Sequence, residues 1–244
     1  MEFWERDNEL LLINLPYKKQ ITNELSISKG VPIFYSIENE LYHSIVTDVK
    51  QKKTTYANYF LAKLIYYLSF SLKNSSLTIT NTFYNRSHFL NGVIGPIYNC
   101  LPLSFKGLDH MKFNELLEVV THKSFDVMRY ESFPIDERQL NRQILFNYIE
   151  DDGSSFQAMN LATINKGDSR IHSVKDLEIS SYPLTATVIN YHLCFYIIVT
   201  NESFILKILY QDNLFIPMKM DKLWQEFFKF IEQINPSNNK TQLN

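Results

Sequence analysis

The stretch THKSFDV, from Thr121 to Val127, places His122 and Asp126 four residues apart. A His-x-x-x-Asp sequence closed by glycine is a catalytic signature of acyl-transferring enzymes. The histidine acts there as a general base that takes a proton from an incoming amine, alcohol or thiol. In this chain Val127 occupies the position of that glycine. The pair is therefore a candidate catalytic site whose context must be examined.

The apolar spacing around this pair predicts an amphipathic helix over about residues 112–129. Its buried stripe is formed by four large apolar residues and one small one: Phe113, Leu116, Leu117, Val120 and Ser124. His122 and Asp126 fall on the polar flank of the same helix, where an i, i+4 pair is equally typical of a solvated surface. We favour the surface interpretation and keep His122 with Asp126 as the secondary, catalytic one.

The other familiar catalytic patterns do not occur in the sequence. It contains no Gly-x-Ser-x-Gly nucleophile motif and no glycine-rich phosphate loop. The six histidines and two cysteines show no spacing typical of metal ligands, so no metal site is predicted. The residues alone therefore predict no self-sufficient catalytic constellation.

Two polar features next to β-rich stretches could line a site. Asn85 and Arg86 directly follow such a stretch, and an arginine there either holds a carboxylate or phosphate or simply ends the strand. Asn99 lies inside the apolar run GVIGPIYNCLPL, a few residues after Gly95. A buried asparagine needs hydrogen-bond partners, so Asn99 is either a structural bridge or points into a cavity.

Composition limits the partners. The 24 basic and 26 acidic residues leave a net charge of -2, which predicts no nucleic-acid or membrane partner. Cys100 and Cys194 are too few and too far apart for a disulfide framework, and the acidic N-terminus does not resemble a signal peptide. The apolar run LLLI is too short to span a bilayer. We therefore expect a cytoplasmic protein.

The elements that must position these residues follow from periodicity and turn signals. We expect irregular or short extended segments over residues 1–35 and then a helix that begins at an Ser36 N-cap. The further expected elements are a helix from Thr54 or Thr55, strands over 77–84 and 96–105, a helix over 112–129, a strand over 142–150, a loop over 151–182, strands over 184–199 and 203–210, and a helix over 217–234. Pro102 suggests that its strand lies at an edge. These elements predict one α+β layered domain over residues 1–235, followed by a frayed tail over 236–244.

Taken in order, several stretches resemble the C-terminal half of a condensation domain from nonribosomal peptide synthetases. FWERDNELLLINLP is similar to the family's opening Tyr-Trp…Leu-Pro stretch, and KKTTYANYFLAKLIYYLSFSL resembles the helix with Thr-x-Phe-x-x-Leu-Leu-Ala. LTITNTFYNR matches the strand that ends in Gly-Arg or Asn-Arg. VIGPIYNCLPL looks like Gly-x-Phe-Val-Asn-Thr-x-x-Leu, with Gly95 and Asn99 in register. KFNELLEVV resembles the Ser-Phe-x-Glu-Leu-Leu helix that follows.

Later stretches resemble the family more loosely. RYESFPIDE stands in the place of His-Gln-Asp-x-Pro-Phe-Glu, and NRQILFNYIE in that of Arg-x-Pro-Leu-Phe-Gln-x-x-Phe, without the proline. SSYPLTATVINY is similar to the segment that forms the floor loop of the family's cleft. The resemblance covers about residues 3 to 235. It implies a chloramphenicol acetyltransferase-like half-domain, in which helices pack on one face of a mixed β-sheet.

The family's His-His-x-x-x-Asp-Gly motif lies in the other, N-terminal half, and this sequence contains no adjacent histidine pair. The resemblance therefore implies a stand-alone half that is inactive by itself and pairs with a separate His-bearing half or a synthetase. Together they would form an amide bond between substrates on carrier proteins, with phosphopantetheine arms and no directly bound cofactor. This chain would supply one tunnel wall, formed by Asn85, Arg86, Gly95, Asn99, Tyr182 and Thr185.

Three alternatives remain open at this point. The chain could be an inactive scaffold that binds a carrier protein or a synthetase, or an autonomous acyltransferase that uses His122. It could also be a fragment without function. A half-domain should leave apolar surface unburied, so we expect the isolated chain to self-associate. The substrates and the product are not predicted.

Overall fold

The structure, a computed structural model, describes residues 11–18, 28–83, 98–132, 140–150, 171–174, 177–180, 187–200 and 202–233. In chain order its elements are β1 (Ser28–Ile37), α2 (Asn39–Gln51), α3 (Tyr56–Ser71), β2 (Ser76–Phe83), β3 (Asn99–Lys106), the short η2 (Leu108–His110), α4 (Phe113–Met128), β4 (Ile144–Glu150), β5 (Ile171–Val174), β6 (Leu177–Ser180), β7 (Thr187–Ile189), β8 (Leu193–Val199), β9 (Phe204–Gln211) and α6 (Pro217–Glu232). None of the helices within these ranges is long and apolar enough to cross a membrane.

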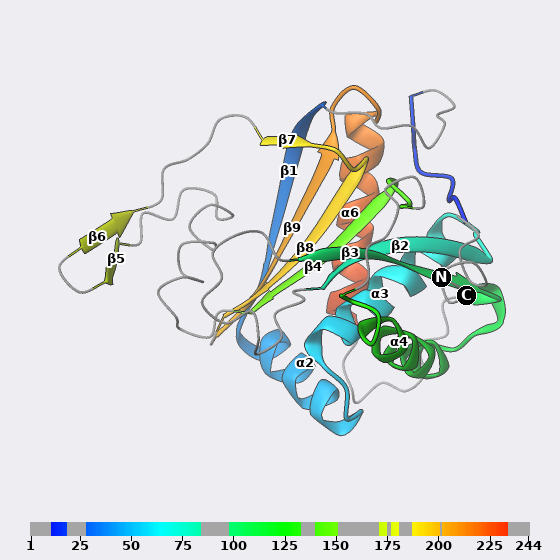
Figure 1. Cartoon of the computed structure of the whole chain (residues 1–244), viewed down its shortest axis with the longest axis horizontal. Coiled ribbons are helices and arrows are strands. Elements are labelled where there is room, and N and C mark those ends of the chain that lie inside the picture. The colour runs from blue at the N-terminus through cyan, green and yellow to red at the C-terminus, as the bar shows by residue number, and fades with distance from the viewer. Residues whose placement is uncertain are drawn as a thin grey trace.

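Seven of the strands form one mixed sheet in the order β3-β2-β4-β8-β9-β1-β7 (Figure 1). The β2–β4 and β4–β8 pairs are parallel, and the other neighbours are antiparallel. Strands β5 and β6 form a separate two-stranded sheet. The expected mixed α+β sheet is therefore confirmed.

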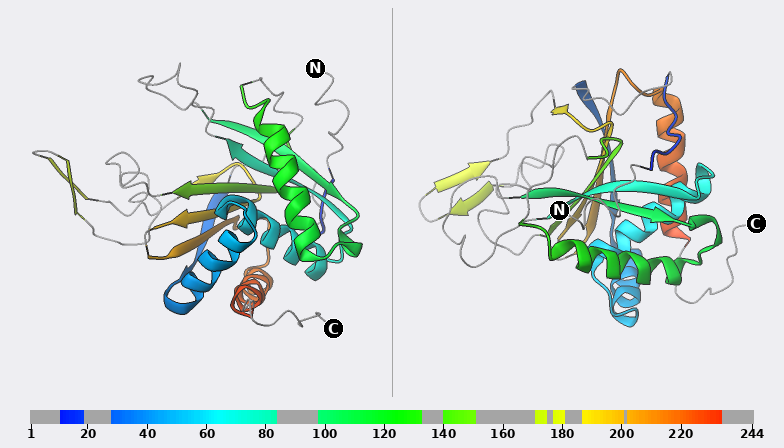
Figure 2. Two further views of the ribbon diagram at one scale, coloured as in Figure 1. Left: turned by 90° about the horizontal axis from the view of Figure 1, so that it is seen from below. Right: turned by 45° about the vertical axis from the view of Figure 1, so that its right-hand side comes forward.

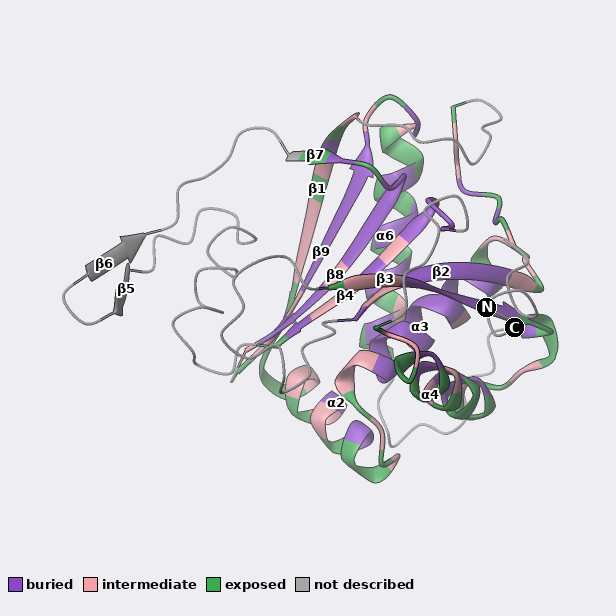
Figure 3. Ribbon diagram, viewed as in Figure 1, coloured by how far each residue is buried: buried purple, intermediate pink, exposed green. Residues whose placement is uncertain are grey.

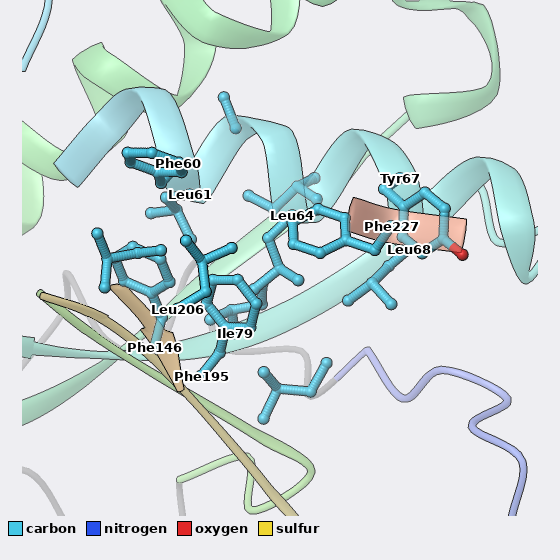
Figure 4. Close-up of a cluster of buried hydrophobic side chains, with 14 of the residues drawn as sticks. Phe60, Leu61, Leu64, Tyr67, Leu68, Ile79, Phe146, Phe195, Leu206 and Phe227 are labelled. Atoms are coloured by element: carbon cyan, nitrogen blue, oxygen red, sulfur yellow. The ribbon is translucent and has the colours of Figure 1, made fainter. Parts of the chain in front are cut away.

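The helices cover one face of the seven-stranded sheet, as two further views show (Figure 2). Side chains from α2, α3, α4 and α6 join one core cluster with alternate residues of the strands. Helix α3 lies at its centre, with buried residues all round its circumference (Figure 3). Phe60, Leu61 and Leu64 of this helix pack against strand residues such as Ile79 and Phe146 (Figure 4). A helix that is apolar on all sides is typical of such a buried position.

Local signals place the ends of the helices. The Thr55 hydroxyl accepts a hydrogen bond of 3.1 Å from the Asn58 backbone N–H, which caps α3 at one of the two expected positions. Pro217 occupies the first turn of α6, where a missing N–H costs nothing. The predicted helices over 112–129 and 217–234 are confirmed within two residues at each end.

The start of the chain differs from the expectation. Ser36 does not cap a helix but lies inside β1, a strand of ten residues, and α2 begins three residues later at Asn39. The β-branched and aromatic residues of β1 lie within residues 30–37, which pair with β9, and this long-range pairing outweighs the local cap signal. The run 184–199 is likewise two strands, because residues 190–192 form a bend between β7 and β8.

Proline positions agree with the sheet order. Strand β3 lies at the edge, as Pro102 predicted, so the N–H that proline lacks would face no further strand. Strand β1 pairs with β7 only through residues 28–30, and Pro32 comes after that short pairing. Both prolines therefore lie where the strand has a hydrogen-bonded neighbour on one side only.

Candidate functional site

His122 and Asp126 are exposed on α4, on the side of the helix away from its buried residues. Asp126 Oδ1 lies 3.9 Å from Arg129 Nη1, which is also exposed. His122 borders a shallow surface pocket with Lys52, Lys53 and other residues of the α2–α3 connection and α4. Both side chains are exposed on the helix surface, so the geometry gives no support to a preorganised catalytic role for His122.

A larger cavity of about 600 Å³ lies on the other face of the sheet. Successive residues of a strand point to opposite faces. Ile144 and Phe146 of β4 join the core beneath the helices, whereas Leu145 packs with Cys194 in a second cluster. Leu145 and Cys194 both line the cavity. The cavity therefore lies on the face that the helices leave uncovered.

A row of side chains that crosses five strands forms the floor of this region. Register places Cys100 of β3 beside Thr82 of β2, and Asn147 of β4 beside Tyr196 of β8. Asn81 pairs with Phe146, so Thr82 and Asn147 are adjacent as well. Tyr196 in turn pairs with Lys207 of β9. Every residue of the row except Lys207 lines the cavity.

Asn99 links this cavity to the helical layer. It is half-buried at the first residue of β3, and its Nδ2 donates a hydrogen bond of 3.0 Å to the Glu131 carbonyl just after α4. It also lines the cavity. Asn99 therefore bridges two elements and borders the cavity.

Among the described residues that line the cavity, one is a cation. Arg142, which is 8% exposed, lies with its guanidinium carbon 5.9 Å from the centre of the Tyr191 ring. Arginine presents five N–H donors and stays charged, so it can bind a carbonyl or carboxylate oxygen. Among the fourteen described residues that line the cavity there is no aspartate, glutamate or histidine. This wall can therefore bind and orient a ligand, but those residues supply no carboxylate or imidazole base.

The thiols of the cavity are in their neutral form. Burial raises the pKa of Cys100, although a hydrogen bond with Thr82 opposes this effect. Burial raises the pKa of Cys194 to about 12. A thiol is a weak nucleophile unless it is deprotonated, so neither cysteine is prepared for covalent catalysis.

The remaining residues of the expected tunnel wall, Asn85, Arg86, Gly95, Tyr182 and Thr185, lie outside the described residues. Analysis of the sequence missed Arg142, Asn147, Tyr191 and Tyr196 as site residues. The sequence did contain a signal for one of them. Asn147 is a polar residue within the apolar run of its strand, and it directly follows Phe146, so the two side chains are expected on opposite faces of the sheet. The positions of the tyrosines depend on which strands are neighbours, and no local pattern encodes that order.

Comparisons with known proteins agree with this architecture. The condensation domain family model matches residues 2–243. The X-domain from teicoplanin biosynthesis superposes with a TM-score of 0.77 at 15% identity, over 96% of this chain and 54% of that one. A four-domain nonribosomal peptide synthetase superposes with a TM-score of 0.74 at 11% identity, over 96% of this chain and 19% of that one. The epimerization domain from the third module of tyrocidine synthetase B gives 0.66 at 11% identity, over 97% and 54%.

The chain spans about half of the X-domain and epimerization-domain structures. At these low identities the superpositions show the fold. No match is found among curated proteins. The family model covers nearly the whole sequence, and the chain therefore belongs to the condensation domain family.

Proposed function

We propose that this chain is the C-terminal half of a split condensation domain. It would pair with a separately encoded N-terminal half that carries the catalytic histidine. The observation that carries the proposal is the cavity on the helix-free face, which Asn99 of the family-like motif lines and whose described lining contains no carboxylate or imidazole base. A wall of this kind supports substrate binding with the base supplied from elsewhere.

The proposed reaction forms an amide between two substrates that carrier proteins deliver on phosphopantetheine arms. The nitrogen of the acceptor amine attacks the thioester carbonyl of the donor, the C–N bond forms and the C–S bond breaks. The histidine of the partner half takes the proton of the amine, and the leaving thiolate is protonated. Arg142 and Asn99 on this chain would hold the donor chain in place during attack. No directly bound cofactor is required.

The solved structures with this fold come from several biosynthetic settings. They include nonribosomal peptide synthetases and the condensation domains of the Monacolin K and enacyloxin polyketide synthases. One of them was solved as a complex of an X-domain with OxyB. These settings support acyl transfer on a carrier protein as the process, and they support a recruiting scaffold as the rival function.

Reconstitution separates these functions. The chain would be mixed with an N-terminal half that ends in His-His-x-x-x-Asp-Gly, together with an acyl-loaded donor and an aminoacyl-loaded acceptor carrier protein. Product that requires both halves supports the split enzyme, whereas binding of the halves or of a carrier protein without product supports the scaffold. Absence of any binding contradicts both.

The His122→Ala variant tests the autonomous alternative in the same assay. We expect its turnover in the reconstituted pair to equal that of the wild type, because His122 is exposed on α4 and does not line the cavity. Turnover by the chain alone that disappears in His122→Ala would instead establish an autonomous acyltransferase. Glu118→Ala, at an exposed residue one turn earlier on α4, serves as the control for nonspecific effects on this helix.

A further inference from the structure

Asn147 lies in the middle of β4 and lines the cavity. Its Oδ1 atom is buried and accepts no hydrogen bond from any described residue. The adjacent hydroxyls have other partners. Thr82 Oγ1 lies 4.0 Å from Cys100 Sγ, and the Tyr196 hydroxyl interacts with the thiol of Cys194. The carbonyl oxygen of Asn147 is thus a buried acceptor whose neighbours along the row do not satisfy it.

Buried polar atoms in folded proteins almost always have a hydrogen-bond partner, because leaving one unsatisfied costs free energy. A ligand that donates a hydrogen bond to an unsatisfied acceptor in such a cavity therefore gains more binding free energy than it would from the same bond at the surface. The complementary group for a carbonyl oxygen is an N–H or O–H donor. Arg142, in the same cavity, offers the opposite polarity and suits a carbonyl oxygen.

An amide carries both an N–H donor and a carbonyl acceptor in one rigid unit. We infer that Asn147 is a specificity-determining residue, which selects acyl chains that contain an amide N–H over ester or hydrocarbon chains of the same shape. The inference rests on the proposed function, because it takes the cavity to hold the donor chain. It deepens that function by naming the residue and the atom that would recognise the donor chain.

A matched pair of small ligands isolates the N–H group. N-acetyl-L-leucine methyl ester and its 2-acetoxy analogue differ only in that an ester oxygen replaces the amide N–H. Each would be titrated into the folded full chain, with affinity measured by NMR chemical-shift perturbation. We expect the wild type to bind the amide about five to ten times more tightly, which corresponds to one net hydrogen bond.

The Asn147→Leu variant keeps the size of the side chain and removes the acceptor. We expect it to bind both ligands with equal affinity. The control is Asn114→Leu, the same substitution at an exposed residue of α4 outside the cavity, which should keep the wild-type preference for the amide. If Asn147→Leu does not fold, Asn147→Ala replaces it, because alanine removes the same acceptor without adding an apolar side chain of that size.

Three outcomes would overturn the inference. These are equal wild-type affinity for the two ligands, a preference for the amide that persists in Asn147→Leu, and no binding of either ligand at millimolar concentration. A bound water that satisfies Asn147 would give the first of these. Failure of the chain to pair with an N-terminal half would refute the split-domain proposal but leave this binding ratio unchanged, so the two can be distinguished.

Discussion

At the scale of single residues, Lys63 is the most unusual group of the helical layer. It lies in the middle of α3, is 3% exposed, and its Nζ is 3.7 Å from the centre of the Phe113 ring. Tyr59 and Phe230 complete an aromatic surround at 5.0 and 5.6 Å. The faces of these rings attract the ammonium group, but they replace little of the water that burial removes. The lysine therefore holds three elements together in an apolar setting that disfavours its charge.

Burial lowers the pKa of Lys63 to about 7, while nearby Asp48 raises it and Lys52 lowers it further. The unfolded chain keeps the ordinary value of 10.5. Between these values the unfolded state binds one more proton than the folded state, so the free energy of unfolding increases as the pH rises from 7 to 10.5. We expect Lys63→Met to remove this increase and to be most stabilising, relative to the wild type, near pH 6.

Urea unfolding of both proteins at pH 6, 7.5 and 9 measures the effect. The quantity of interest is the stability of Lys63→Met minus that of the wild type, in which groups common to both proteins cancel. The exposed Lys222→Met is the matched control and should give a difference that does not change with pH. A difference for Lys63→Met that is independent of pH would show that the lysine keeps its ordinary pKa in the fold.

At the scale of elements, a side-chain clamp ties the segment 11–18 to the sheet. Gln143, just before β4, accepts a hydrogen bond of 2.8 Å from the Ile13 N–H and donates one of 2.9 Å to the Ile13 carbonyl. It also donates to the Tyr17 hydroxyl at 3.0 Å, and that hydroxyl lies 2.9 Å from His192 Nδ1. The side-chain amide of Gln143 thus bonds to both backbone groups of Ile13, as the backbone of a neighbouring strand would.

We expect Gln143→Leu to lower the free energy of unfolding by about 3 kcal/mol, because it leaves a buried N–H and a buried carbonyl of Ile13 without partners. Chemical denaturation measures the loss, and limited proteolysis should show earlier cleavage near residues 11–18. Gln225→Leu, on the exposed side of α6, is the matched control and should change stability little. A loss no greater than that of the control would mean that the segment is held by apolar packing alone.

The elements that could be predicted from the sequence are those whose signals lie in adjacent residues. Helices α3, α4 and α6, strands β2 and β3 and the edge position of β3 follow from apolar period, β-rich composition, Thr55, Pro217 and Pro102. Strand β1 was missed because its partner, β9, is more than 160 residues away. Long-range pairing is also the reason that most of the site was not predicted. Asn99 was found within its motif, but the cavity beside it arises from strand register between β2, β4 and β8, which no short stretch contains.

At the scale of the whole molecule, strands β8 and β9 are buried on both faces although the described helices cover only one. Continuous apolar strands of this kind are typical of a sheet that is covered on both sides. Two large apolar residues remain exposed at the border of the cavity, Tyr98 at 59% and Val188 at 65%. An exposed apolar border around a binding cavity is typical of a surface that takes a protein partner.

The split-domain proposal therefore makes a prediction about Val188. A charge at this position should change the stability of the isolated chain little, since the side chain is exposed, but should weaken pairing with an N-terminal half by tenfold or more, because an unpaired charge would be buried. The dissociation constant of the two halves, measured by calorimetry, tests Val188→Asp. Met218→Asp is the control, since Met218 is 79% exposed on α6, at the helical face.

If self-association of the isolated chain uses the same border, Val188→Asp should also reduce it in sedimentation experiments. Equal pairing by wild type and Val188→Asp would place the partner on another surface.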